Sequence, residues 1–328
     1  MEGSLIVYLE AVNLPLLYFG NSSYKGKSMN NLDGLYVALA TPYTPDGSIS
    51  IEDLISLSKF VRNNKIGGFY VGGSTGESLL HSTDERKDIL SVIAQENKKT
   101  SKLIAHVGAV DTRETLKLAR YCSSLGYNGI SAIPPIYYPY TKQEITDFYR
   151  SVIDASDGTP VILYNIPAMS GVNFTTEDLD KLLSLEGVAG IKQTSNNTYQ
   201  TEQIRRLHPE KTILNGFDEI LLSALSVGVD GSIGSTFNIM GHRYYKIHQL
   251  FQAGKMQEAL NIQHSCNRVI DLLVTVGVFK GIKYLLWKMG VISTCNCRAP
   301  FGSIDSRFLE ALDNIAIELK EEYSAIAK

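Results

Sequence analysis

One lysine stands where a buried position is expected. Lys192 ends the apolar run Val188-Ala189-Gly190-Ile191 and is followed by the polar Gln193-Thr194-Ser195. An apolar run of this kind predicts a strand buried on both faces, where a lysine is rare unless it is paired or reactive. A structural ion pair is one interpretation. The other is an amine nucleophile, because apolar surroundings disfavour the ammonium form and the neutral amine attacks carbonyl carbons.

A tyrosine ends the preceding apolar run. Tyr164 follows Val161-Ile162-Leu163 and leads into Asn165-Ile166-Pro167. Neighbouring parallel strands lie about 4.8 Å apart, so two consecutive strands would bring this phenol beside Lys192. A hydroxyl held there can carry a proton to or from a reacting group. The alternative is a core tyrosine with one hydrogen bond, and among 18 tyrosines only the position distinguishes this one.

Three polar loops follow other apolar runs. In Gly72-Gly73-Ser74-Thr75-Gly76-Glu77 the glycines let the backbone approach a ligand, and successive N–H groups can form a nest for an anion. The hydroxyls of Ser74 and Thr75 suit a small carboxylate. The other loops are Gly216-Phe217-Asp218-Glu219 and Gly234-Ser235-Thr236-Phe237-Asn238. The carboxylates of Asp218 and Glu219 can accept hydrogen bonds from sugar hydroxyls or simply cap a helix, and a plain turn is the alternative for the glycine-rich loop.

These runs belong to an alternation that begins at Asp33. Eight β-rich runs alternate with amphipathic helical patterns, which predicts a parallel sheet with helical crossovers. Eight strands close a (β/α)8 barrel, in which side chains at the carboxyl ends of the strands face the active site. A doubly wound open sheet is the alternative, although no Gly-x-Gly-x-x-Gly follows the first run. The predicted strands are 35–41, 68–71, 103–107, 129–133, 160–164, 188–192, 212–214 and 231–233. The predicted helices are 51–63, 83–97, 112–125, 142–155, 176–185, 199–207 and 219–227, with polar caps at Ser82, Asp111, Thr141 and Thr175.

The chain divides into three predicted parts. Residues 1–32 form an N-terminal extension of unknown role, whose apolar stretch is too short to span a bilayer and has no basic start typical of a signal peptide. Residues 33–243 form the catalytic barrel. Residues 244–328 form a helical C-terminal domain, interrupted near Pro300.

Composition excludes several classes of protein. The 328 residues are 44% apolar, carry a formal net charge of -3 and contain no run of lysine or arginine. Nucleic-acid and membrane partners are therefore not expected. Four scattered cysteines indicate reduced thiols in the cytoplasm rather than a disulfide scaffold. The Cys295-x-Cys297 spacing matches no zinc pattern, so no metal site is expected.

Together these segments resemble the pyruvate-dependent aldolase superfamily of N-acetylneuraminate lyase and dihydrodipicolinate synthase, and most closely the N-acetylneuraminate lyase family. The resemblance extends from about Gly34 to Gly302. The segments that carry it are YVGGSTGE (70–77), YNIPAMSG (164–171), IKQTS (191–195) and GSTFNIMG (234–241).

The resemblance implies a (β/α)8 barrel with a helical C-terminal domain, assembled as a homotetramer, with a position like Tyr137 close to a subunit boundary. The implied activity is reversible cleavage of N-acetylneuraminate, a sialic acid, into pyruvate and N-acetylmannosamine, with no cofactor or metal. Lys192 would form a Schiff base with the substrate and Tyr164 would relay protons. The region of Ser74 and Thr75 would hold the pyruvyl carboxylate. The hydroxyl-rich remainder would contact Thr194, Gly216, Asp218, Glu219 and Ser235.

One segment departs from the synthase pattern. Synthases usually carry an arginine shortly after the Tyr-Asn-x-Pro segment, whereas this chain has Ala168-Met169-Ser170-Gly171. A site without that cation, and with Asp218 and Glu219, suits a neutral polyol. The alternatives are an aldolase for a 2-keto-3-deoxy sugar acid, a dihydrodipicolinate synthase, and a non-catalytic barrel that binds keto acids or sugars.

Overall fold

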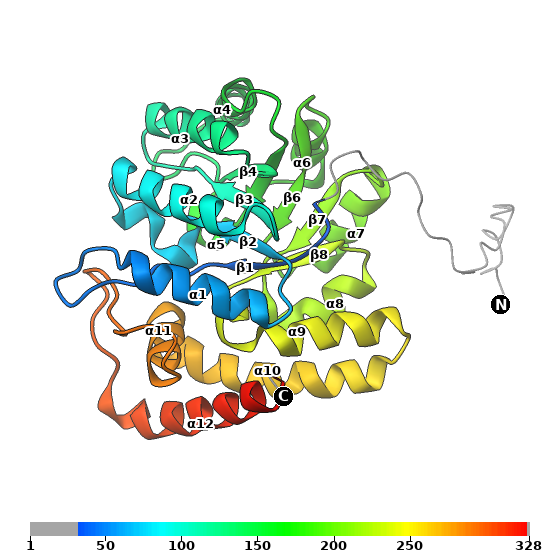
Figure 1. Cartoon of the computed structure of the whole chain (residues 1–328). Coiled ribbons are helices and arrows are strands. Elements are labelled where there is room, and N and C mark those ends of the chain that lie inside the picture. Colours follow the sequence, from blue (N-terminus) through cyan, green and yellow to red (C-terminus); the bar gives the residue numbers. More distant parts are fainter. Residues whose placement is uncertain (1–31, 327–328) are drawn as a thin grey trace, which may run out of the picture.

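The computed structural model describes residues 32–326, in which eight parallel strands close into a barrel (Figure 1). Each strand pairs with the next along the chain, and β1 also pairs with β8. The predicted (β/α)8 barrel is therefore confirmed, and the open doubly wound sheet is wrong. The strands differ from the predicted ranges by only a few residues at their ends: β1 (Gly34–Ala38), β2 (Gly68–Val71), β3 (Lys102–His106), β4 (Gly129–Ala132), β5 (Val161–Asn165), β6 (Val188–Gln193), β7 (Thr212–Asn215) and β8 (Gly231–Gly234).

Helices between the strands form the outer layer of the barrel. The side chains of Ser82, Asp111, Thr141 and Thr175 accept hydrogen bonds from first-turn N–H groups, which confirms these predicted caps. The predicted helix 219–227 is interrupted, because Ile220 has a non-helical φ of -119°. The helices are α1 (Ile51–Asn63), α2 (Thr83–Asn97), α3 (Thr112–Leu125), α4 (Lys142–Ala155), α5 (Pro167–Ser170), α6 (Thr176–Leu183), α7 (Thr198–Leu207) and α8 (Leu221–Ser226), with 3₁₀ turns η1 (Ser74–Gly76), η2 (Ser78–Leu80) and η3 (Asp218–Ile220).

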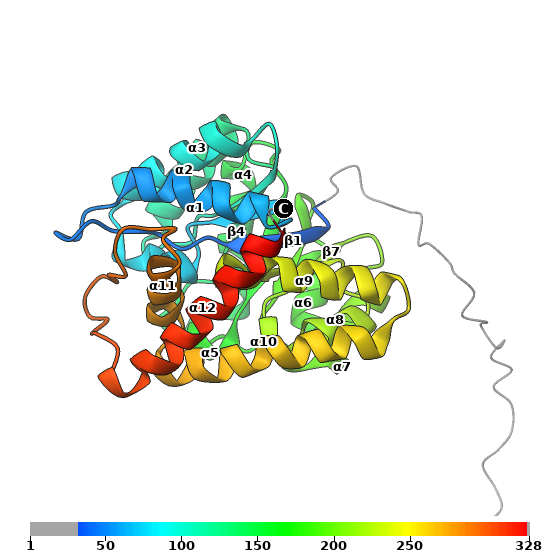
Figure 2. The same ribbon diagram turned by 60° about the horizontal axis from the view of Figure 1, so that its bottom comes forward.

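The chain ends in helices that gather along one side of the barrel (Figures 1 and 2). They are α9 (Phe237–Gln252), α10 (Met256–Val276), α11 (Val278–Lys288) and α12 (Leu309–Ile326), the last preceded by the 3₁₀ turn η4 (Ser306–Phe308). The boundary predicted at residue 243 falls inside α9, which packs on both β1 and α10. None of the described helices is long and apolar enough to cross a membrane. Apart from Leu32, the predicted N-terminal extension lies outside the described residues.

Alternation along the strands creates two apolar layers. Side chains that point outward pack against the helices, whereas those that point inward fill the barrel. Ile162 and Tyr164 on β5 share the inner face, because side chains two residues apart on a strand point the same way. The inner layer also contains Tyr36, Ala38, Tyr70, Ile104, Leu214 and Ile233. The barrel interior is therefore a packed core, and the polar groups described below lie at the carboxyl ends of its strands.

One buried amide connects the first strand to the start of α9. Asn238 donates from Nδ2 to the main-chain oxygens of Ala38 (2.8 Å) and Ser235 (2.7 Å), and its Oδ1 accepts from the N–H of Ala40 (3.2 Å). The side chain is fully buried. Asn238→Ala leaves these main-chain groups without their partner, so we expect it to lower the free energy of unfolding by about 2–4 kcal/mol. Urea denaturation measures this, and a loss below about 0.5 kcal/mol would contradict the assigned role.

Candidate active site

Lys192 and Tyr164 lie side by side inside the barrel. They are register partners on β6 and β5, and their exposed fractions are 4% and 3%. The Lys192 Nζ lies 4.1 Å from the centroid of the Tyr164 ring and 4.4 Å from that of Tyr70. Lys192 forms no ion pair with any residue that the structure describes, which argues against a structural ion pair at this position. The amine is instead enclosed by two aromatic rings.

His106 and Tyr70 belong to this cluster, and neither was among the predicted site residues. The His106 ring lies 5.9 Å from the Tyr164 ring and 6.0 Å from the Tyr70 ring, centroid to centroid. Its Nε2 accepts from the N–H of Ile133 (3.3 Å), so Nδ1 carries the hydrogen and donates to the Gly72 oxygen (2.9 Å). Burial lowers the pKa of His106 to about 3, which keeps the ring neutral. The signal that could have found His106 is its place two residues after the inward-pointing Ile104.

The glycine-rich loop after β2 meets the loop after β8. These strands are the two neighbours of β1, so their carboxyl ends are brought close. The Oγ1 of Thr75 lies 2.7 Å from the Oγ of Ser235, within hydrogen-bond distance. Gly72 has a φ of +75°, a conformation that favours glycine. Ser74, the first residue of η1, is half-buried. The structure therefore brings Thr75 and Ser235 together and places Ser74 in the same loop.

Thr194 and Gly216 are also in contact. A Cβ at Gly216 would lie 1.9 Å from the Thr194 Oγ1, so only glycine leaves room for this hydroxyl. Thr194 is buried, and its Oγ1 has no hydrogen-bond partner among the residues that the structure describes. A buried hydroxyl without a partner is costly, which makes it available to a bound polar ligand.

Asp218 is held by the loop after β8. Its Oδ2 accepts hydrogen bonds from the main-chain N–H (2.7 Å) and the hydroxyl (2.6 Å) of Thr236. The Tyr244 hydroxyl, 2.6 Å away, then donates to Thr236 Oγ1. The other oxygen, Oδ1, has no partner within the described part of the chain. Glu219 is half-buried beside it, and its main-chain oxygen accepts from the Asn267 Nδ2 (3.1 Å).

Asp218 gives a pH-dependent stability. Burial raises the pKa of its carboxyl from an ordinary value of 3.8 to about 7, although hydrogen bonds from Thr236 oppose the rise. Between these two pH values the folded protein keeps a proton that the unfolded chain has released. The stabilisation of the folded state by this proton is therefore complete below pH 4 and is lost as the pH approaches 7. The free energy of unfolding of wild type, relative to Asp218→Asn, is therefore expected to fall by about 2–3 kcal/mol from pH 5 to pH 8. Urea denaturation at both pH values measures it, and a constant difference would contradict it.

These residues surround the carboxyl ends of the strands, but their roles toward a ligand stay predictions. Lys192 and Tyr164 are in contact, as are Thr75 with Ser235 and Thr194 with Gly216. Thr236 and Tyr244, which hold Asp218, were not predicted. Arginine is absent from the segment after Tyr164, where Met169 is exposed.

Comparisons with known proteins agree with this architecture. The model of the Dihydrodipicolinate synthetase family matches residues 31–319. The N-acetylneuraminate lyase of Escherichia coli (strain K12 / DH10B) is 46% identical over 292 residues, 89% of this chain and 98% of that protein. The crystal structure of N-acetylneuraminate lyase from Fusobacterium nucleatum complexed with pyruvate is 37% identical, with a TM-score of 0.82, over 90% of this chain and 98% of that one. A catalytic lysine mutant of the Ruminococcus gnavus sialic acid aldolase is 28% identical, with a TM-score of 0.86, over 92% of this chain and 99% of that one. The family model and these relatives match nearly the whole barrel, including the strand that carries the enclosed lysine. This chain therefore belongs to the dihydrodipicolinate synthetase family.

Proposed function

We propose that this protein is an N-acetylneuraminate lyase, which reversibly cleaves N-acetylneuraminate into N-acetylmannosamine and pyruvate through a Schiff base on Lys192. The observation that carries the proposal is the enclosed amine of Lys192 beside Tyr164, in a chain that matches 98% of the length of an Escherichia coli protein with that activity in its name. The related Fusobacterium nucleatum enzyme binds pyruvate, and the Ruminococcus gnavus aldolase has a catalytic lysine.

In the proposed mechanism, the neutral amine of Lys192 attacks the C2 carbonyl of the open-chain sugar acid, and loss of water gives a protonated imine. This cation is an electron sink for the next step. Tyr164 takes the proton from the C4 hydroxyl while its own phenolic proton passes to the substrate carboxylate, the C3–C4 bond breaks, and its electron pair becomes the C2–C3 double bond of an enamine. N-acetylmannosamine leaves as the aldehyde. Protonation of the enamine at C3 and hydrolysis of the imine release pyruvate and restore the amine.

The remaining residues are proposed to bind the two halves of the substrate. The loop with Ser74 and Thr75 supplies hydroxyl groups for the carboxylate. Thr194 and Asp218 each have one buried oxygen without a partner among the described residues, and a sugar hydroxyl would supply it. Gly216, Glu219 and Ser235 complete this second half. A carboxylate acceptor with unpaired oxygen suits hydroxyl donors better than an acidic second substrate.

We also propose that the protein is a cytoplasmic homotetramer. Tyr137 is 87% exposed with a φ of +79°, and its ring packs edge-on against exposed Tyr138 at 5.0 Å. Exposed aromatic clusters of this kind are typical of subunit contacts. The described cysteines are all free, as expected in a reducing compartment. Native mass spectrometry is expected to detect four copies of the 36.2 kDa chain, and a monomer would contradict the assembly.

Trapping with borohydride tests the proposed chemistry. The protein is incubated with pyruvate, reduced and digested, and mass spectrometry is expected to find one reduced pyruvyl group on Lys192. Absence of the adduct from folded protein would favour a barrel that binds keto acids without catalysis. A substrate panel then decides among aldolases, because N-acetylneuraminate is expected to release pyruvate faster than 2-keto-3-deoxy sugar acids. Faster cleavage of the latter would replace the proposed substrate.

A further inference from the structure

A buried ion pair joins the glycine-rich loop to the C-terminal helices. The Lys283 Nζ on α11 lies 2.5 Å from the Glu77 Oε1, and the side chains are 1% and 0% exposed. The same Nζ donates to the main-chain oxygen of Asn296 (3.0 Å) and lies 3.9 Å from the centroid of the Tyr43 ring. The proposed mechanism uses none of these groups, so their presence needs a separate explanation.

Glu77 ends the turn that carries the two hydroxyls of the loop. It directly follows η1, which contains Ser74 and Thr75, and its main-chain N–H donates to the Ser74 oxygen (2.9 Å). Its φ of 57° lies in the left-handed region, which costs a residue with a Cβ about 1 kcal/mol. Surrounding contacts must therefore hold this conformation. The carboxylate is held from two sides, since the Arg298 N–H donates to Oε2 (2.8 Å) opposite Lys283.

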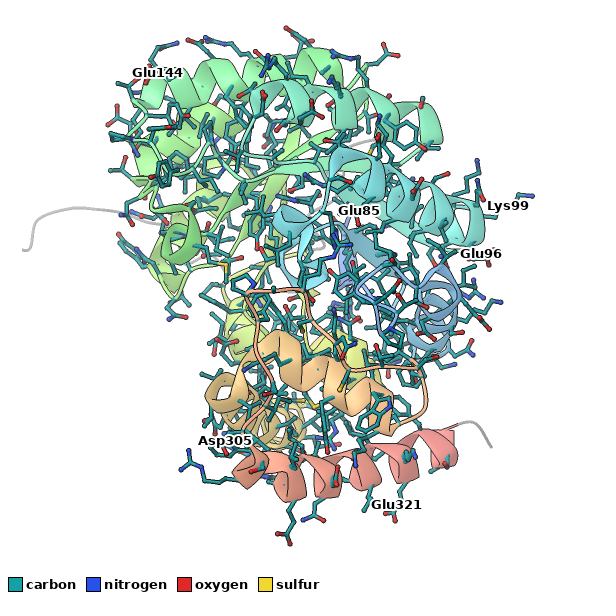
Figure 3. The ribbon with its side chains drawn as sticks, turned by 90° about the vertical axis from the view of Figure 1, so that its left-hand side faces the viewer. Glu85, Glu96, Lys99, Glu144, Asp305 and Glu321 are labelled. Carbon is teal, nitrogen blue, oxygen red and sulfur yellow. The ribbon has the colours of Figure 1, made fainter. Side chains whose placement is uncertain are left out.

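The Arg298 side chain holds the far end of the same loop. Its Nη1 donates to the Leu80 oxygen at the end of η2 (2.9 Å), and Nη2 donates to the Gly47 oxygen (3.1 Å). It also forms an ion pair with Glu85, the capping-box residue of α2. Figure 3 shows Glu85 at the start of α2, beside the segment between α11 and α12. The C-terminal part of the chain thus holds residues 74–80 at Glu77, in the middle of the segment, and at Leu80, its last residue.

Stability alone is a weak reason for this arrangement. Burial of two charges costs several kcal/mol per ion, and apolar side chains of similar volume often stabilise a fold as well or better. Unlike an apolar side chain, the Glu77 carboxylate is tied to a specific partner at each oxygen: the Lys283 ammonium in an ion pair at Oε1 and the Arg298 N–H at Oε2. Such a contact fixes the geometry of the loop that it holds.

We propose that Lys283 and Arg298 are positioning residues, which act through Glu77 and Leu80 to fix the Ser74 and Thr75 hydroxyls for the substrate carboxylate. This inference rests on the proposed function, in which that loop binds the pyruvyl group. It assigns a part of the keto-acid site to residues about 200 positions later in the chain, one on helix α11 and the other in the segment between α11 and α12. Affinity for the keto acid, rather than for the sugar, should therefore depend on them.

Kinetics in the condensation direction test the inference, because pyruvate and N-acetylmannosamine are then varied separately. Lys283→Met is expected to raise the KM for pyruvate about tenfold and to leave the KM for N-acetylmannosamine within about twofold, since a displaced loop weakens one half of the site. The matched control is Lys288→Met. Lys288 lies on the same helix, but it pairs with Asp313 at the surface and does not contact the loop. Both KM values of the control are expected to match wild type.

Lys283→Met leaves the Glu77 charge buried without its partner, and this variant can fail to fold. Two further variants test the inference in that case. Glu77→Gln combined with Lys283→Met removes both charges, and it is expected to fold with the pyruvate KM still raised. Arg298→Gln keeps the main-chain N–H but loses the partly exposed guanidinium, and it is expected to raise the pyruvate KM about threefold.

Wild-type KM values for pyruvate in the folded variants, with only the amount of active enzyme or its heat stability reduced, would overturn the inference. The pair would then be purely structural. Failure of the proposed function is a different result, because wild-type protein would then give no borohydride-trapped pyruvate adduct.

Discussion

Lys192→Met is expected to abolish the borohydride-trapped pyruvate adduct and to lower kcat for N-acetylneuraminate cleavage by at least about 10⁴-fold. Without the amine no imine forms, and the remaining site offers no other electron sink for breaking a C–C bond. Methionine has a stem of similar length, so it can still pack between Tyr164 and Tyr70. The expected loss is therefore chemical rather than structural, and circular dichroism with thermal unfolding checks that the variant is folded.

Lys211→Met is the matched control for this variant. The Lys211 Nζ donates to the main-chain oxygen of Val188, at the opposite end of the strand that carries Lys192 (2.7 Å). Its loss removes one hydrogen bond far from the carboxyl ends of the strands, so kcat is expected to stay within about twofold of wild type. A Lys192→Met enzyme with substantial turnover, or an adduct that persists on another lysine, would show that the nucleophile lies elsewhere.

The sequence predicted the parts of the site that depend on neighbouring strands. Consecutive parallel strands pair in register, so the ends of two apolar runs were enough to bring Tyr164 beside Lys192. The same reasoning located the loops after β2, β7 and β8, because each polar segment follows directly on a buried strand. In these cases a local pattern fixes a position in space, since the barrel supplies the same geometry at every strand end.

The remaining contacts depend on residues that no local pattern connects. His106 packs edge-on against Tyr164 from a strand two places away around the barrel, and Lys283 reaches Glu77 from a helix outside it. These side chains lie in apolar segments whose period predicts burial but not the partner. The domain boundary predicted at residue 243, which falls inside α9, was also drawn from a local pattern. The amphipathic pattern of α9 does not distinguish a helix that covers the barrel from one that packs on α10.

Tyr164→Phe is expected to separate imine formation from bond cleavage. The ring that lies 4.1 Å from the Lys192 Nζ is retained, so the surroundings of the amine change little, and pyruvate should still be trapped on Lys192. Only the hydroxyl that is proposed to accept the C4 proton is lost. The kcat for cleavage is therefore expected to fall about 10²–10⁴-fold, the usual contribution of a positioned acid or base. Single-turnover release of N-acetylmannosamine measures the step directly.

Tyr36→Phe provides the comparison within the same barrel core. Tyr36 is fully buried in the inner layer, and its hydroxyl donates to the Leu32 oxygen (2.8 Å), at the beginning of the described chain. Its loss should lower stability by about 1 kcal/mol and leave kcat close to wild type. Equal losses of kcat in the two variants would mean that both hydroxyls matter only for packing. A Tyr164→Phe enzyme with near-normal kcat would require another base, and because Thr75 and Ser235 already share a hydrogen bond at the strand ends, that pair is where the search would begin.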